Sequence, residues 1–170
     1  YLPVAEEVIK KIGEKSGAFE ATTTQDCSLV NRENLKNYDA LIFATTGELP
    51  MSDEQKTALI DFVKIDGKGF VGIHNATDTF YEFPEYGEML GGYFNGHPWS
   101  QEVDVIVEDR NHPSTKHLNP KEEGILEEIY TFKNWSRDKT RVLVSLDNSS
   151  VDVSKGNRDD DDYALVWCHS

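Results

Sequence analysis

The sequence predicts an α/β fold in which a mainly parallel, doubly wound sheet lies between two layers of helices. Two short apolar runs of strand length, at residues 38–45 and 69–74, stand on either side of a helical pattern. This strand–helix–strand order is a βαβ unit, whose crossover is right-handed in almost all known sheets. The first run, YDALIFAT, is typical of a strand that is buried on both faces of a parallel sheet.

The first half of the chain carries clear helix signals. Apolar residues recur at helical spacing over residues 3–16, and Gly17 is a natural stop. Ser52 and Gln55 form a capping-box pattern, so a second helix begins there and continues until Gly67. Two shorter elements are expected between these helices, a β-branched strand and a helical turn, at residues 19–24 and 31–36.

The second half of the chain is expected to hold one short helix followed by strands. The helix covers residues 83–90 and is closed by Gly91 and Gly92. Apolar and charged residues then alternate over residues 102–108, as in a half-exposed strand. Further strands, antiparallel or near a sheet edge, are expected at residues 125–133 and 140–146, and another strand at residues 163–168.

Length and charge restrict the class of protein. The chain has 170 residues, enough for one domain with a real hydrophobic core. It carries 17 basic and 31 acidic residues, a net charge of −14, which disfavours binding to nucleic acid and to anionic membranes. The four adjacent carboxylates at residues 159–162 are expected in a solvated loop, with a cation site as the alternative. Small neutral molecules or proteins are the expected partners, and a homo-oligomer is left open.

The cysteines and the hydropathy give two further expectations. Cys27 and Cys168 lie far apart without CxxC spacing, so we expect ordinary buried or half-buried thiols rather than a disulfide framework or a zinc cluster. No apolar run approaches the ~20 residues that cross a bilayer, and no charged-then-apolar leader opens the sequence. We therefore expect a soluble protein, either cytoplasmic or periplasmic.

Polar residues follow both strands of the βαβ unit. Residues 45–50 (TTGELP) follow the first strand, and residues 74–78 (HNATD) follow the second. Ligands of open parallel sheets collect at the carboxyl ends of the strands. The candidate site is therefore expected where these two segments begin.

The same segments carry a family resemblance. Residues 45–99, from TTGELP through GIHNATD to NGHPW, closely resemble the core of the trehalose-utilisation (ThuA-like) family. Looser matches follow at NHP (residues 111–113), at EIYTF (residues 128–132) and from Asp162 to Trp167. The resemblance implies a flavodoxin-like, three-layer fold of the class I glutamine-amidotransferase-like type. It also implies a role in sugar utilisation.

Two departures from that family pattern are visible. Family members usually begin with a strand and a histidine-bearing loop, and usually end with a glycine-rich strand and a Gly-His pair. The sequence shows neither, so residues 1–170 are expected to be a single ThuA-like domain that is truncated at both ends and lacks its first strand.

His74 is the strongest candidate for a catalytic residue. Glutamine amidotransferases of this fold place a nucleophilic cysteine at the sharp turn after the strand, where this sequence carries histidine. Amidotransfer by thiol chemistry is therefore excluded. Imidazole can still act as a general base or a metal ligand, because its reference pKa is near 6.5. The alternative is a histidine that is merely hydrogen-bonded in the core.

Other candidate residues surround His74 in the expected site. Asp78 is expected to orient an imidazole or hold a hydroxyl, or else to cap the next helix. Glu128 suits acid–base work, although an exposed strand face explains it equally well. The remaining expected substrate-binding residues are His97, Tyr93, Trp99, Tyr130 and Thr46. For His97 the alternative is a turn that places Trp99 in the core, and for most aromatic residues the alternative is ordinary packing.

The preferred hypothesis is a hydrolase or isomerase that acts on a trehalose-type or 3-keto-glycoside. His74, Asp78, His97 and Glu128 are expected to converge on one cleft, with a small-molecule sugar as partner and no obligatory cofactor. One alternative is a non-catalytic carbohydrate-binding or assembly module. The other is a metal-dependent hydrolase, in which His74, His97 and a carboxylate hold a divalent metal such as zinc.

Overall fold

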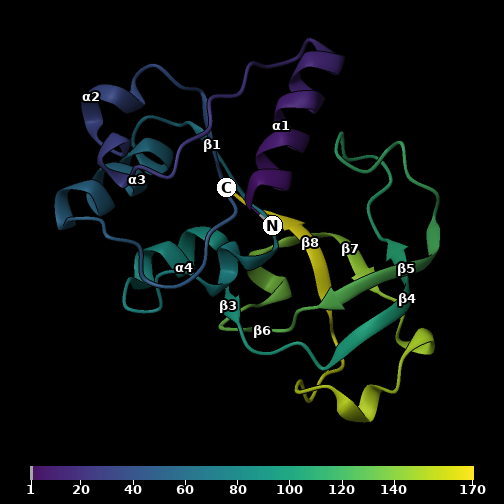
Figure 1. Cartoon of the computed structure of the whole chain (residues 1–170). Coiled ribbons are helices and arrows are strands. Elements are labelled where there is room, and N and C mark those ends of the chain that lie inside the picture. The colour runs from purple at the N-terminus through teal and green to yellow at the C-terminus, as the bar shows by residue number, and fades with distance from the viewer. Residues whose placement is uncertain (1) are drawn as a thin grey trace. The chain divides into compact units, whose positions relative to one another are not determined.

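A computed structural model describes residues 2–170, and the chain forms two compact units (Figure 1). The first unit ends at Tyr86 and the second begins at Gly87. The described helices of the first unit are α1 (Leu2–Ser16), α2 (Arg32–Leu35) and α3 (Asp53–Lys64), with the short 3₁₀ helices η1 (Cys27–Leu29) and η2 (His74–Asp78). Helix α4 (Pro84–Leu90) runs across the boundary.

The helices of the first unit begin and end at the residues that the sequence indicates. Helix α1 stops at Ser16, and Gly17 follows with a left-handed φ of 63°. Helix α3 has the expected capping box: the Ser52 hydroxyl accepts from the Gln55 N–H, and the Gln55 side chain accepts from the Ser52 N–H. The helical turn at residues 31–36 is confirmed as α2.

The βαβ unit is confirmed. Strands β1 (Ala40–Phe43) and β2 (Gly69–Gly72) pair in parallel, with α3 between them in the sequence. The expectation that the strand at residues 38–45 is buried on both faces of the sheet is wrong, however. Ile42 of β1 is 41% exposed, and Val71 of β2 is 49% exposed. Within residues 2–170 these strands pair only with each other, so no further strand covers them.

The apolar side chains of the first unit gather into two groups. Leu35, Ala58 and Phe62 form a buried cluster that joins α2 to α3. A second group consists of aromatic rings: Phe43 of β1 lies 5.0 Å from Phe70 of β2, measured between ring centroids. Tyr86, Phe80 and Phe83 continue this aromatic group.

The expected strand at residues 19–24 is wrong. This segment runs without regular secondary structure, and the described part of the chain offers it no ladder partner. β-branched residues favour strands only where a neighbouring strand takes up the backbone hydrogen bonds.

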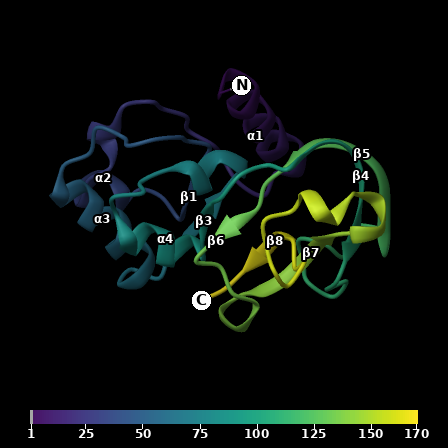
Figure 2. The ribbon, with the colours of Figure 1, turned by 90° about the horizontal axis from the view of Figure 1, so that it is seen from below.

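The second unit is built on an antiparallel sheet (Figure 2). Its strands are β4 (Trp99–Val107), β5 (Lys121–Ile129), β7 (Arg141–Leu146) and β8 (Ala164–Cys168), in the spatial order β5-β4-β7-β8. Two short strands, β3 (Tyr93–Phe94) and β6 (Phe132–Lys133), form a separate antiparallel pair. The strands expected to be antiparallel are thus confirmed. The fold is mixed α/β, but the sheets are small and mostly antiparallel, so a doubly wound parallel sheet is not confirmed.

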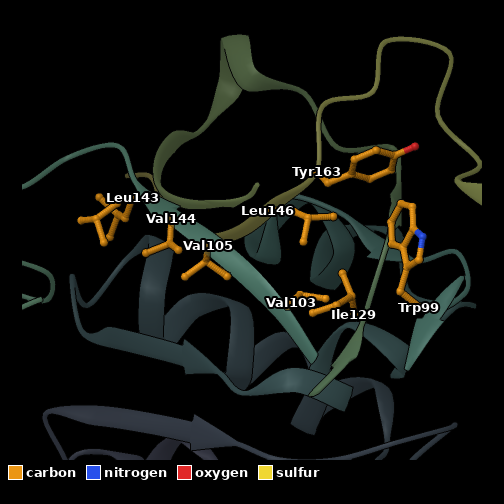
Figure 3. Packing of buried hydrophobic residues seen from close by; sticks show 9 residues of the cluster. Trp99, Val103, Val105, Ile129, Leu143, Val144, Leu146 and Tyr163 are labelled. Atoms are coloured by element: carbon orange, nitrogen blue, oxygen red, sulfur yellow. The ribbon is translucent and has the colours of Figure 1, made fainter. Parts of the chain in front are cut away.

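Side chains from this antiparallel sheet form the core of the second unit (Figure 3). Trp99, Val103 and Leu143 are each 1–2% exposed. The Trp99 ring meets the Tyr163 ring edge to face at 4.9 Å. Gly156 packs so closely here that an added Cβ would lie 1.9 Å from the Tyr163 hydroxyl. Only glycine therefore fits this position without moving the core.

Lys121, the first residue of β5, joins strand β4 to the turn after β7. Lys121 Nζ lies 2.9 Å from carboxylate oxygens of both Asp104 and Asp147. Hydrogen bonds from Ser149 and Lys121 lower the pKa of Asp147 to about 2, and the Lys121 hydrogen bond also lowers the pKa of Asp104.

Among residues 2–170, no helix is long and apolar enough to cross a bilayer.

We predict that Lys121→Met makes the second unit more sensitive to acid. A carboxyl whose folded pKa lies below its unfolded value, near 4, stabilises the fold above that value and loses this contribution as pH falls through the folded pKa. For Asp147 the window is therefore about pH 4 down to about pH 2. Without Lys121 the folded pKa values rise, and the acid midpoint should move to higher pH.

Acid titration followed by tryptophan fluorescence measures this midpoint. Lys11→Met is the matched control, because it removes an exposed i,i+4 pair with Glu7 on α1, and such pairs contribute little. Equal midpoints for both variants would contradict the prediction.

Candidate functional site

The turn after β2 holds His74 in an unusual backbone conformation. His74 begins η2 with φ of 47°, in the left-handed region. For a residue with a Cβ this region costs roughly 1–2 kcal/mol, and such outliers cluster at functional sites. The preceding Ile73 N–H donates to the Phe43 carbonyl at 2.8 Å, so this turn begins beside the end of β1.

Backbone hydrogen bonds join this turn to the turn after β1. The Gly47 N–H donates to the Asp78 carbonyl at 2.7 Å, and the Phe80 N–H donates to the Gly47 carbonyl at 3.2 Å. The hydroxyls of Thr45 and Thr79 lie 2.9 Å apart. The segments expected to carry the site are therefore held side by side, as their place after parallel strands indicates.

The Asp78 carboxylate accepts hydrogen bonds from both sides. The Thr46 hydroxyl donates to Oδ2 at 2.7 Å, and the Tyr81 hydroxyl donates to Oδ1 at 2.7 Å. The structure thus brings the expected residues Thr46 and Asp78 into direct contact. From the sequence, Tyr81 is an aromatic residue for sugar stacking or ordinary packing and has no expected role beside Asp78, although its place three residues after Asp78 is a usable signal.

Phe80 anchors this arrangement. Its ring is fully buried, and its backbone is also left-handed, with φ of 58°. The ring packs edge to face against Phe83 and Tyr86, with centroid distances of 5.8 and 5.2 Å. Lys56 Nζ lies 5.4 Å from the Phe80 ring centroid, a cation–π contact. Aromatic burial therefore offsets the cost of the strained backbone between Asp78 and Tyr81.

The second unit brings together a different set of expected residues. His97 Nδ1 lies 3.5 Å from the Glu128 carboxylate, and both side chains are partly exposed. The His97 ring stacks on Phe94 and Tyr130 at 5.8 and 6.2 Å between centroids. Phe94 and Tyr130 are themselves 4.3 Å apart. An imidazole, a carboxylate and two aromatic faces thus share one surface region.

Tyr93 and Trp99 take packing positions in the same unit. Tyr93 is 7% exposed, and its hydroxyl accepts from the Gly87 N–H at 3.2 Å. Trp99 is 1% exposed, and its indole N–H donates to the Asp152 carbonyl at 3.0 Å. The location of Trp99 agrees with the alternative in which the GHPW turn places it in the core.

The expected residues therefore fall into two sets. His74, Asp78 and Thr46 belong to the first unit, whereas His97, Glu128 and Tyr130 belong to the second. Their convergence on one cleft stays a prediction. Within residues 2–170 no three His, Cys, Asp or Glu side chains are grouped as ligands for a metal ion.

Two open hollows are found elsewhere. One, of about 630 Å³, lies in the first unit where α1 ends, with Gly13, Gly17 and Phe19 in its lining. The other, of about 260 Å³, lies in the second unit beside Trp135 and Arg158. Neither hollow is lined by an expected catalytic or substrate-binding residue, but Asp160 and Asp162, from the segment with the alternative cation site, line the second.

Both cysteines are free thiols of intermediate burial. Burial raises the pKa of the Cys27 thiol, and the Asp26 carboxylate adds to this effect. Cys168 Sγ lies 3.8 Å from His112 Nε2. Neither cysteine lies in the turn after β2.

Comparison with known proteins identifies relatives of the whole chain. The family model described as trehalose utilisation (ThuA) matches residues 2–170. The crystal structure of a ThuA-like protein from Bacteroides uniformis is similar, with TM-score 0.76 and 27% identity over 97% of this chain and 69% of its own. A ThuA-like protein from Parabacteroides merdae has TM-score 0.73 and 18% identity, over 99% of this chain and 70% of its own, and supports the fold alone. Comparison with curated proteins gave no match.

We predict that His74→Gly is more stable than His74→Ala by about 1 kcal/mol, because glycine adopts the left-handed conformation without a Cβ clash. Chemical denaturation measures the difference. The matched pair is Asp78→Gly and Asp78→Ala, at a position with ordinary φ, where the order should reverse. Equal stability of the two His74 variants would show that the left-handed backbone is not maintained in solution.

Proposed function

The chain belongs to the trehalose-utilisation (ThuA) family, and on that premise we propose that it is a hydrolase or isomerase of trehalose-type or 3-keto-glycosides. The observation that carries the proposal is the junction of two turns at the carboxyl ends of β1 and β2. There a strained His74 precedes an Asp78 whose two oxygens are both held by hydroxyl donors. Strained backbone and positioned carboxylates are features that accompany catalysis on other folds.

His74 has the role of proton-transfer residue in this proposal. Hydrolysis and isomerisation of glycosides both require protons to move on and off oxygen, and imidazole exchanges protons near neutral pH. In hydrolysis, His74 takes a proton from water as the water oxygen attacks the anomeric carbon, and the proton later passes to solvent. The leaving oxygen must gain a proton at the same time, which a general acid supplies.

Asp78 has the role of holding the substrate. Its carboxylate is fixed by Thr46 and Tyr81, so it keeps one orientation and can accept a further hydrogen bond from a sugar hydroxyl. Fixed polar groups avoid the entropy cost of being ordered when the substrate binds. Within the second unit, His97 and Tyr130 form a separate surface whose flat rings suit the apolar C–H face of a pyranose.

We also propose that β1 and β2 belong to a larger doubly wound parallel sheet, in three layers of the flavodoxin-like type. Support comes from their parallel pairing and from the exposure of Ile42 and Val71, which are apolar strand residues. A two-stranded sheet with apolar faces in water is marginally stable at best.

His74→Ala should lower kcat/KM for the preferred glycoside by about 10²- to 10⁴-fold, the usual contribution of one proton-transfer residue. The free energy of unfolding should change by less than about 1 kcal/mol, because His74 is only partly buried. A panel of glycosides and 3-keto-glycosides, assayed by release or interconversion of sugars, provides the measurement.

The double variant Cys27→Ala and Cys168→Ala is the control and should retain full activity, since neither thiol lies at the proposed site. Unchanged turnover in a folded His74→Ala protein would remove His74 from the mechanism. Sugar binding without turnover by the native protein would indicate a binding module instead.

A further inference from the structure

We propose that the Asp78 site presents hydrogen-bond acceptors and so selects ligands by their hydrogen-bond donors, with Tyr81 as a specificity-determining residue. This inference rests on the proposed function for the site and names the chemistry that the site recognises: the hydroxyl protons of a neutral polyol, or an ammonium group on a sugar. Phosphate and carboxylate groups, which offer only acceptors, are rejected.

The direction of each hydrogen bond carries the argument. A carboxylate has no proton to give, so it can only accept. Both hydroxyls that touch Asp78 must therefore be donors: Thr46 to Oδ2 and Tyr81 to Oδ1, each at 2.7 Å. Because each hydroxyl has one proton, Thr46 and Tyr81 can offer only lone pairs to any further partner.

The same polarity extends to the neighbouring threonines. The Thr79 hydroxyl donates to the Asn75 carbonyl at 3.3 Å, and it lies 2.9 Å from the Thr45 hydroxyl. If the Thr79 proton is used on Asn75, Thr45 must donate to Thr79, and the Thr45 oxygen is left with lone pairs. In that arrangement the threonine hydroxyl protons of both turns are used in hydrogen bonds within the protein.

Further acceptors lie in the same segments. Glu48, in the turn after β1, uses one carboxylate oxygen to accept from the Glu82 N–H at 3.2 Å. The buried side-chain oxygen Oδ1 of Asn75 has no hydrogen-bond donor within the described structure. Glu48 repeats the pattern at Asp78, because its carboxylate offers oxygen without a proton, whereas the Asn75 oxygen is buried away from any ligand.

The cationic and titratable groups of these segments do not create a binding site for an anion. The Lys56 ammonium lies over the Phe80 and Phe83 rings, 5.4 and 5.6 Å from their centroids, and not on the Asp78 carboxylate. His74 is the titratable group at the start of the turn, and the proposed function uses it for proton transfer. A ligand phosphate would meet the carboxylates of Asp78 and Glu48, and like charges repel.

Tyr81 is the residue that makes the array specific. The residue is 39% exposed, and its hydroxyl bonds the Asp78 carboxylate. Tyr81→Phe removes one acceptor and one donor to Asp78 but keeps the ring. Thr46→Val makes the equivalent change on the other carboxylate oxygen.

Ligand-observed NMR titration of the full chain with three probes tests the proposal: trehalose, D-glucosamine in its ammonium form, and D-glucose 6-phosphate. We expect trehalose and glucosamine to bind, glucosamine the tighter, and the phosphate at least tenfold more weakly. Tyr81→Phe and Thr46→Val should each weaken trehalose and glucosamine about three- to tenfold, the effect of one hydrogen bond.

Tyr86→Phe and Thr57→Val are the matched controls. Each loses the same hydroxyl but from a structural bond, to the Ala76 carbonyl and to the Asp53 carbonyl, and each should bind the probes like the native protein. The proposal is overturned if the phosphate binds as tightly as glucosamine, if none of the three probes binds, or if both site variants bind unchanged.

The outcomes separate this inference from the proposed function. If Tyr81→Phe converts glycosides with the same KM as the native protein, the proposed function stands and the inference about hydrogen-bond acceptors is wrong. If the native protein binds glucosamine through Tyr81 but converts no glycoside, the inference stands and the proposed enzymatic function is wrong.

Discussion

Parallel pairing of β1 with β2 is the interaction on which the site in the first unit depends. Because Phe43 stands opposite Gly72, the two strands end at the same level, and their following turns leave the sheet together. The hydrogen bond between Gly47 and the Asp78 carbonyl continues this parallel arrangement beyond the strands. A shift of one residue in the pairing would turn every strand side chain to the opposite face and separate Thr46 from Asp78.

The turn after β2 keeps its strained backbone because packing around the turn offsets the cost of that conformation. His74 and Phe80 both have left-handed backbones, each at a cost of roughly 1–2 kcal/mol. Burial of the Phe80 ring contributes an amount of similar size, about 1.5–3 kcal/mol for an apolar side chain. The aromatic contacts with Phe83 and Tyr86 therefore hold the segment that carries Asp78. Rigid packing a few residues away is what gives a surface carboxylate a fixed orientation.

The sequence predicted local structure well and long-range pairing less well. Caps such as Ser52 with Gln55 are decided by residues three apart, so they can be read directly. Burial of the run at residues 38–45 depends on which strands lie beside it, and the run at residues 19–24 has no partner strand among the described residues. A site at the two strand ends was expected, but the hydrogen bonds of Thr46 and Tyr81 to Asp78 depend on side-chain directions that spacing alone does not contain.

The charges of the chain also favour a neutral ligand, in a way that net charge alone does not show. The chain carries −14, but a binding site for an anion needs only a few available cations. Here four guanidinium groups are used within the protein: Arg137 bonds Glu108 and Asp162, and its hydrogen bond lowers the pKa of Glu108. Arg32, Arg141 and Arg158 likewise contact Asp66, Asp109 and Asp160. For these four guanidinium groups an anionic substrate would have to compete with the carboxylates, whereas a polyol needs only acceptors, which the turns after β1 and β2 provide.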